Sequence, residues 1–308
     1  AAEKNSKIVA LSADSSSGSG MTPFNEKFPE RHFEFGIMEQ GIMGFASGLA
    51  TTGKIPFFAA IAPFVTARPF EMFRNDVGYM RQNVKVVGRC AGITYSDLGA
   101  THQSLDDIAI IRTIPGVTVL NPGDPVDIVK AVHAAAAHVG PVYIKVGSPK
   151  MPVLMDENYP FQIGKGVVMQ EGSDVTIIGT GTVLSKAVEA TRILKEKGIQ
   201  ARLINMHTIK PLDRELILKA AAETGKIVTV EEGYLAGGMG SCIAELIVAE
   251  HPVPMKMIGI DDLFCDTGPY EELLDMYGLQ GDKIAETVET SNVVMEFCVV
   301  LLPYTQAA

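Results

Sequence analysis

Glu39 is a carboxylate set in an apolar stretch, directly after Met38 and shortly before Ile42 and Met43. A glutamate at the start of a helix often interacts favourably with the helix dipole, which is a purely structural role. A carboxyl group in an apolar pocket can instead share a proton with a nitrogen of a bound ligand. The residues around Glu39 leave both interpretations open.

His102 is the second candidate, in the stretch Gly-Ala-Thr-His-Gln-Ser-Leu-Asp-Asp that begins at Gly99. An imidazole can donate or accept a proton near neutral pH, although a single histidine is more often structural. The four cysteines form no Cys-x-x-Cys pair and lie at no zinc-ligand spacing from a histidine. We therefore assign no metal ligands to this chain, and reduced thiols fit a reducing compartment.

The elements that must position these side chains follow an alternating pattern. Short β-branched runs alternate with helical stretches, which indicates an α/β fold with parallel sheets. A proline-rich stretch with weak periodicity, 147–170, separates two such series. We expect domains at 1–150 and 171–308 with a linker at 151–170. The expected strands are 7–11, 56–61, 84–88, 117–120 and 142–146, then 175–178, 201–204, 227–230 and 255–260.

Helices are expected between these strands. The stretch 36–52 is rich in small residues, and Asp124 followed by Pro125 is typical of a helix start. The apolar ending, NVVMEFCVVLLPYTQAA, is expected either to add an edge strand or to pack against a partner.

The segment FPERHFEFGIMEQGIMGFASGLA, residues 28–50, resembles the pyrimidine-binding domain of the transketolase family. The resemblance implies two three-layer α/β/α domains, a pyrimidine-binding domain followed by a transketolase C-terminal domain. It also implies thiamine diphosphate as cofactor. Glu39 matches the glutamate that hydrogen-bonds N1′ of the aminopyrimidine and stabilises its 4′-imino tautomer, whose nitrogen removes the thiazolium C2 proton.

Other stretches match the same family in the same order. IVALSADSS implies that Asp14 lies near the cofactor at the subunit interface, and Ile37 is expected beside the same ring. Phe64 matches the aromatic residue that stacks on the pyrimidine, as suits a flat heteroaromatic group. The segment 96–127 implies that His102 contacts a hydroxyl of the donor sugar.

The substrate-binding positions depart from the family pattern. Ser148 stands where relatives of the split type carry arginine, flanked by Lys145 and Lys150. Asp97 lies next to the position of a hydroxyl-binding aspartate, and Ser17 belongs to a serine-rich run that could supply hydroxyl donors. The predicted substrate contacts are therefore His102, Asp97, Ser17 and Ser148, with a phosphate or a sulfonate as the anionic end.

The family binds diphosphate and Mg²⁺ (or Ca²⁺) through a Gly-Asp-Gly motif followed by an asparagine, and this sequence contains no such motif. The resemblance thus implies an N-terminal transketolase subunit as partner, with this chain forming a homodimer inside an α₂β₂ assembly. The implied activity is transfer of a two-carbon ketol unit from a ketose phosphate to an aldose phosphate, in pentose phosphate metabolism.

Three alternatives remain at this stage. The chain could belong to a deoxyxylulose-phosphate synthase-like enzyme, be the β subunit of a 2-oxoacid dehydrogenase, or be a non-catalytic partner. The net charge of −10 argues against a broad nucleic-acid-binding surface. Since no apolar run reaches the ~20 residues of a membrane span, we expect a cytoplasmic protein without a membrane partner.

Overall fold

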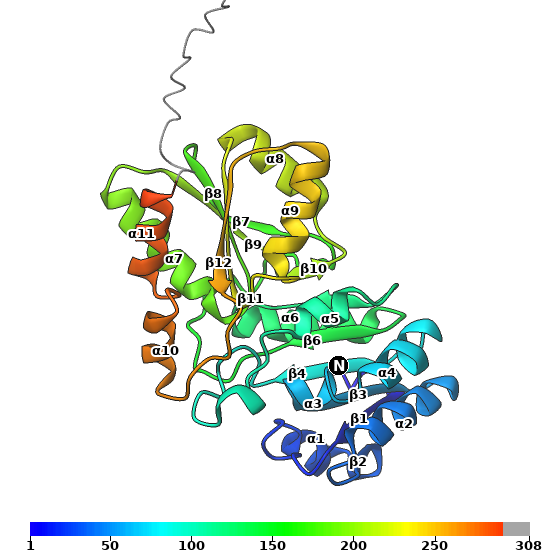
Figure 1. Ribbon diagram of the computed structural model, residues 1–308. Coiled ribbons are helices and arrows are strands. Elements are labelled where there is room, and N and C mark those ends of the chain that lie inside the picture. The colour runs from blue at the N-terminus through cyan, green and yellow to red at the C-terminus, as the bar shows by residue number, and fades with distance from the viewer. Residues whose placement is uncertain (292–308) are drawn as a thin grey trace, which may run out of the picture.

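The computed structural model describes residues 1–291, which form two α/β units, each built on its own sheet (Figure 1). The first sheet has the strand order β10-β5-β6-β4-β3-β1-β2. Its strand β10 comes from the second half of the chain and runs antiparallel to β5. Strand β10 is Thr208–Lys210. The other six strands run parallel to one another: β1 (Ile8–Ser12), β2 (His32–Glu34), β3 (Ile55–Ile61), β4 (Lys85–Arg89), β5 (Thr118–Leu120) and β6 (Val142–Lys145).

Helices cover both faces of the first sheet because successive strand residues point to opposite sides. In β3, Phe58 packs into a cluster with Ile42 and Phe73, whereas Phe57 packs on the other side against Val132. The helical elements of this unit are α1 (Thr22–Lys27), η1 (Pro29–Arg31), α2 (Glu39–Thr51), α3 (Ala62–Val65), α4 (Phe70–Met72), η2 (Phe73–Tyr79), η3 (Gly99–Thr101), α5 (Asp107–Arg112) and α6 (Pro125–Ala137).

The second sheet has the order β12-β11-β8-β9-β7, and only β7 runs antiparallel to its neighbour. Helices α7 and α11 pack together on one face, while α8 and α9 cover the other (Figure 1). The elements are β7 (Val167–Gln170), β8 (Val175–Gly179), η4 (Gly181–Val183), α7 (Leu184–Glu196), β9 (Ala201–Asn205), α8 (Arg214–Thr224), β11 (Ile227–Tyr234), α9 (Met239–Glu250), β12 (Met255–Ile260), α10 (Tyr270–Met276) and α11 (Gly281–Thr290).

Local capping explains where two of these helices begin. The Asp124 side chain accepts a hydrogen bond from the backbone N–H of Asp127 at 2.6 Å, with Pro125 in the first helical turn. Asp213 accepts in the same way from the N–H of Leu216 at 3.2 Å. Each aspartate satisfies an amide that has no partner inside the helix.

The predicted α/β class is confirmed, whereas the expectation of purely parallel sheets is wrong at two edges. Strand β10 joins the first sheet and β7 closes the second, both antiparallel. Strand β7 lies inside the segment expected as linker, so residues 167–170 belong to the second sheet. Helices α10 and α11 were not anticipated, and the apolar ending at 292–308 lies outside the described residues.

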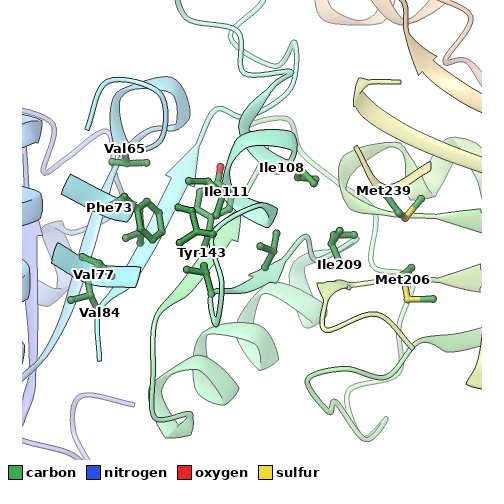
Figure 2. Close-up of a cluster of buried hydrophobic side chains, with 14 of the residues drawn as sticks. Val65, Phe73, Val77, Val84, Ile108, Ile111, Tyr143, Met206, Ile209 and Met239 are labelled. Atoms are coloured by element: carbon green, nitrogen blue, oxygen red, sulfur yellow. The ribbon is translucent and has the colours of Figure 1, made fainter. Parts of the chain in front are cut away.

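One of the hydrophobic clusters spans the two units. Figure 2 shows Ile108 and Ile209, which belong to elements of the first unit (α5 and β10), lying toward Met206 and Met239. All four side chains are at most 2% exposed, so this part of the boundary excludes water. Burial of this continuous apolar surface holds the units together.

A buried network of hydrogen bonds also crosses this boundary. Lys145 Nζ donates to Asp107 Oδ1 at 2.7 Å and to the backbone carbonyl of Glu232, in the second unit, at 3.1 Å. The Tyr143 hydroxyl donates to the other Asp107 oxygen at 2.6 Å. The Glu232 carboxylate in turn accepts from the N–H of Ile93 at 2.6 Å, and burial raises its pKa.

Within residues 1–291, no helix combines the length and the apolar character that crossing a membrane requires.

Candidate active site

The candidate residues follow the carboxyl ends of the parallel strands of the first sheet. Loops at this edge commonly form ligand sites in α/β proteins, because all the parallel strands end there. Asp14 and Ser17 follow β1, Ile37 and Glu39 follow β2, Phe64 follows β3, Asp97 and His102 follow β4, and Ser148 follows β6.

Glu39 is the first residue of α2 and is only 4% exposed. Its Oε1 accepts a hydrogen bond from Arg68 Nη1 at 2.6 Å, forming an ion pair. The two partners differ in burial, since the side chain of Arg68 is 40% exposed and that of Glu39 is 5% exposed. A buried carboxylate is thus held against a cation that reaches it from the solvent side.

Phe64 lies under the same guanidinium. The Arg68 Cζ atom is 3.9 Å from the centroid of the Phe64 ring, which is a cation–π contact. The Gln40 side chain donates to the backbone carbonyl of Arg68 at 3.2 Å, and the Arg68 N–H donates to the carbonyl of Pro63 at 3.1 Å. The backbone of Arg68 is therefore tied to both α2 and α3.

His102 completes the cluster. Its ring meets Phe64 edge-on with centroids 5.2 Å apart, and it meets Tyr95 in the same way at 5.5 Å. Thr101 Oγ1 lies 2.9 Å from His102 Nδ1, which leaves Nε2 available for another group. The links thus run in series, from Glu39 to Arg68, from Arg68 to Phe64 and from Phe64 to His102.

Glu34 organises the loop beside this cluster. Its carboxylate accepts from the N–H of Asp14 at 2.6 Å and from the N–H groups of Phe35 and Gly36 at 3.0 and 3.1 Å. Partial burial raises the pKa of Glu34, but the hydrogen bonds from Ser12 and these amides outweigh it and lower the pKa. Glu34 therefore connects the loop of Asp14 to the segment that leads into Glu39.

Asp14 is exposed and its backbone N–H is bound by Glu34, and four further predicted residues also lie apart from the linked cluster. Ile37 is 73% exposed, and Asp97 and Ser17 are also exposed. Ser148 Oγ lies 2.8 Å from Cys90 Sγ. Among the described residues, no hydrogen bond, ion pair or ring contact joins these four to Glu39, Phe64 or His102.

Three residues of the site escaped sequence reasoning. Arg68 lies in the stretch 66–69, to which the resemblance assigned no clear role. Glu34 lies within the matching segment but carries no separate signal. Tyr95 has none at all, because only folding brings it against His102.

A pocket opens beside this cluster at the boundary between the units. It is lined by Pro63, Ala67 and Asp106 of the first unit and by Tyr234 and Phe264 of the second. Burial raises the pKa of the Asp106 carboxyl. The second unit therefore supplies one wall next to the segment that carries Phe64 and Arg68.

The chain's residues fit the pyrimidine end of thiamine diphosphate. A buried carboxylate stands next to an aromatic face that already receives one flat, hydrogen-bonding group. In contrast, residues 1–291 contain no group of three or more histidine, cysteine or acidic side chains placed to hold a metal ion. The fit therefore concerns the ring alone, without the diphosphate or its metal.

Two family models together match almost all of the residues that the structure describes. Residues 1–151 match the transketolase pyrimidine-binding domain and residues 164–284 match the transketolase C-terminal domain. A putative transketolase C-terminal section of Methanocaldococcus jannaschii is 40% identical over 290 residues, covering 93% of this chain and 90% of that protein. A 6-deoxy-6-sulfo-D-fructose transketolase subunit of a Clostridium species is 38% identical, covering 94% and 92%.

The same relationship holds for the three-dimensional structure. A solved split-gene transketolase, described as an inactive β4 tetramer, superimposes with a TM-score of 0.89 and 39% identity over 96% of this chain and 95% of that one. Members of this family use thiamine diphosphate. The chain belongs to the transketolase family, as a subunit that carries its pyrimidine-binding and C-terminal domains.

Proposed function

We propose that this chain is the C-terminal subunit of a thiamine-diphosphate-dependent transketolase that transfers a two-carbon ketol unit from a ketose to an aldose. The observation that carries this proposal is the buried carboxylate of Glu39 beside the face of Phe64, with His102 at the ring's edge. An acid, a stacking face and a hydrogen-bonding imidazole then converge at one edge of the sheet.

Each residue has a defined part in this proposal. The cofactor, when bound, supplies the electron-sink chemistry. Glu39 shares a proton at the N1′ position of the pyrimidine, Phe64 holds the ring flat, and Asp14 and Ile37 border it. His102 uses Nε2 toward a hydroxyl of the donor sugar, because Thr101 engages Nδ1.

The diphosphate and its Mg²⁺ or Ca²⁺ are proposed to be held by an N-terminal partner subunit. The absence of Gly-Asp-Gly from this sequence supports that assignment. So does the naming of one relative as a C-terminal section and of another as a transketolase subunit. Two copies of this chain would pair with two partner chains in an α₂β₂ assembly that acts in the cytoplasm on sugar phosphates.

The anionic end of the donor is the open part of this proposal. Ser148 replaces the arginine expected for phosphate, and its hydroxyl lies beside Cys90 rather than beside a cation. Asp97 and Ser17 are exposed and available at the same edge of the sheet. One relative carries 6-deoxy-6-sulfo-D-fructose in its name, so sulfonated and phosphorylated ketoses are both proposed as donors.

The test uses this chain assembled with the product of the neighbouring reading frame, if that product carries Gly-Asp-Gly. Turnover with a ketose phosphate and an aldose phosphate supports the proposal. Turnover with pyruvate instead supports a deoxyxylulose-phosphate synthase-like enzyme or a 2-oxoacid dehydrogenase subunit. A non-catalytic subunit is identified if Glu39→Ala leaves the turnover of the assembled complex intact.

A further inference from the structure

The position of Arg68 suggests that the chain fills its own ring site when no cofactor is present. The guanidinium is planar and carries N–H donors in one plane. It donates to Glu39 at 2.6 Å while its central carbon lies 3.9 Å from the Phe64 centroid. One flat group therefore makes both contacts that the proposed function assigns to the pyrimidine ring.

Two flat groups cannot share this face of Phe64. A separation of 3.9 Å is van der Waals contact, so no ring fits between the guanidinium and the phenyl group. Entry of a pyrimidine onto this face thus requires the guanidinium to leave.

The contact also has a clear physical cause in the free subunit. A buried carboxylate without a partner is costly, and Arg68 is the only ion-pair partner that Glu39 has among residues 1–291. The ion pair therefore stabilises the chain before the cofactor arrives.

The geometry favours displacement by rotation of the side chain. The backbone of Arg68 is fixed by Gln40 and by Pro63, as described above. Its side chain is 40% exposed and so has a path to solvent. The guanidinium can swing out while the loop that carries it stays in place.

We propose that Arg68 is a built-in stand-in for the cofactor's aminopyrimidine, holding Glu39 and Phe64 until the ring displaces it. This inference rests on the proposed function, since it assumes that thiamine diphosphate binds there. The affinity of such a site is reduced by the fraction of molecules in which it is filled. If the contact is formed in nine tenths of the molecules, the apparent affinity for the cofactor falls about tenfold.

The test compares Arg68→Ala and Arg68→Lys with the wild type, with the exposed Arg192→Ala as a matched control. Thermal unfolding of the free chain is expected to show a lower Tm for Arg68→Ala. That loss should shrink when Glu39→Gln is already present, because the ion pair is then gone. If Arg68→Ala lowers the Tm equally in the wild-type and Glu39→Gln backgrounds, the two residues are not coupled and the inference is wrong.

Titration calorimetry then measures thiamine diphosphate, with Mg²⁺, binding to the complex assembled with the partner subunit. We expect about tenfold tighter binding for Arg68→Ala, a smaller gain for Arg68→Lys and none for Arg192→Ala. Equal or weaker binding by Arg68→Ala overturns the inference, and if that variant does not fold, Arg68→Lys decides in the same way. Failure of the proposed function looks different, because the wild-type complex would then bind no thiamine diphosphate at all.

Discussion

The ring of His102 meets the ring of Phe64 edge-on, with centroids 5.2 Å apart, although the two residues follow different strands of the first sheet. The contact joins a proposed sugar-binding residue to a proposed cofactor-binding residue. It means that a change at either ring can be tested for its separate effects on cofactor affinity and on donor affinity.

Replacing Glu39 by glutamine is expected to lower kcat of the assembled complex by about 10²–10⁴-fold, because a positioned proton donor and acceptor is lost. Steady-state turnover with a ketose phosphate and an aldose phosphate measures this. The side chain keeps its size, so circular dichroism of the variant should match the wild type. Undiminished turnover in a correctly folded complex would remove Glu39 from the mechanism.

Phe64→Ala should weaken thiamine diphosphate binding several-fold, since a stacked aromatic pair contributes about 0.5–1.5 kcal/mol beyond its buried area. Phe64→Tyr keeps the aromatic face and serves as the control, with binding close to the wild type. Calorimetric titration of the assembled complex gives both affinities. Equal loss in the two variants would argue against stacking.

His102→Ala is expected to raise KM for the donor ketose and lower kcat by about tenfold or more, because a hydrogen bond to a substrate hydroxyl is lost. Cofactor affinity should change far less, since His102 touches only the edge of Phe64. Kinetics and cofactor titration on the same preparation separate the two effects. A selective loss of cofactor binding would place His102 with the cofactor instead.

Lys145→Met should destabilise the chain by about 3–5 kcal/mol, because the buried Asp107 loses its cation. The double variant Lys145→Met with Asp107→Leu removes both charges and should recover much of that loss. Denaturant unfolding measures both. If the double variant is as unstable as the two single losses combined, the lysine and aspartate act independently.

We expect the burial of His207 to cause a specific loss of stability in acid. Burial lowers its pKa from 6.5 to about 4, and its ring stacks on Phe161 with centroids 4.1 Å apart. Between those pH values the unfolded chain binds more protons than the folded chain, so this contribution to stability is complete above pH ~6.5 and is lost as pH falls toward ~4.

His207→Gln should remove that dependence. As the pH falls from ~6.5 to ~4, the unfolding free energy of the variant is expected to rise relative to that of the wild type by about 1.4 kcal/mol per pH unit. Asp127, whose pKa burial raises to about 6, titrates in the same range with the opposite sign, but it is present in both proteins and cancels in the difference. A constant difference between pH 7 and pH 4 would contradict the prediction.

The order of elements and several details of the site could be predicted from the sequence. The β-branched runs marked the strands, and Asp124 with Pro125 marked the start of α6, because both signals act over a few neighbouring residues. Glu39, Phe64 and His102 were singled out through the resemblance to the transketolase family, whose matching motifs are short stretches of sequence, and their roles stay predictions.

Only the tertiary structure decided which distant groups meet. Arg68 was left without a role, yet it pairs with Glu39. Lys145 was noted only as a neighbour of Ser148 in the sequence, yet it is buried against Asp107. Strand β10 crosses from the second half of the chain to pair with β5. Such contacts depend on how whole sheets and helices pack, and hydrophobic periodicity fixes the face of an element without fixing its neighbour.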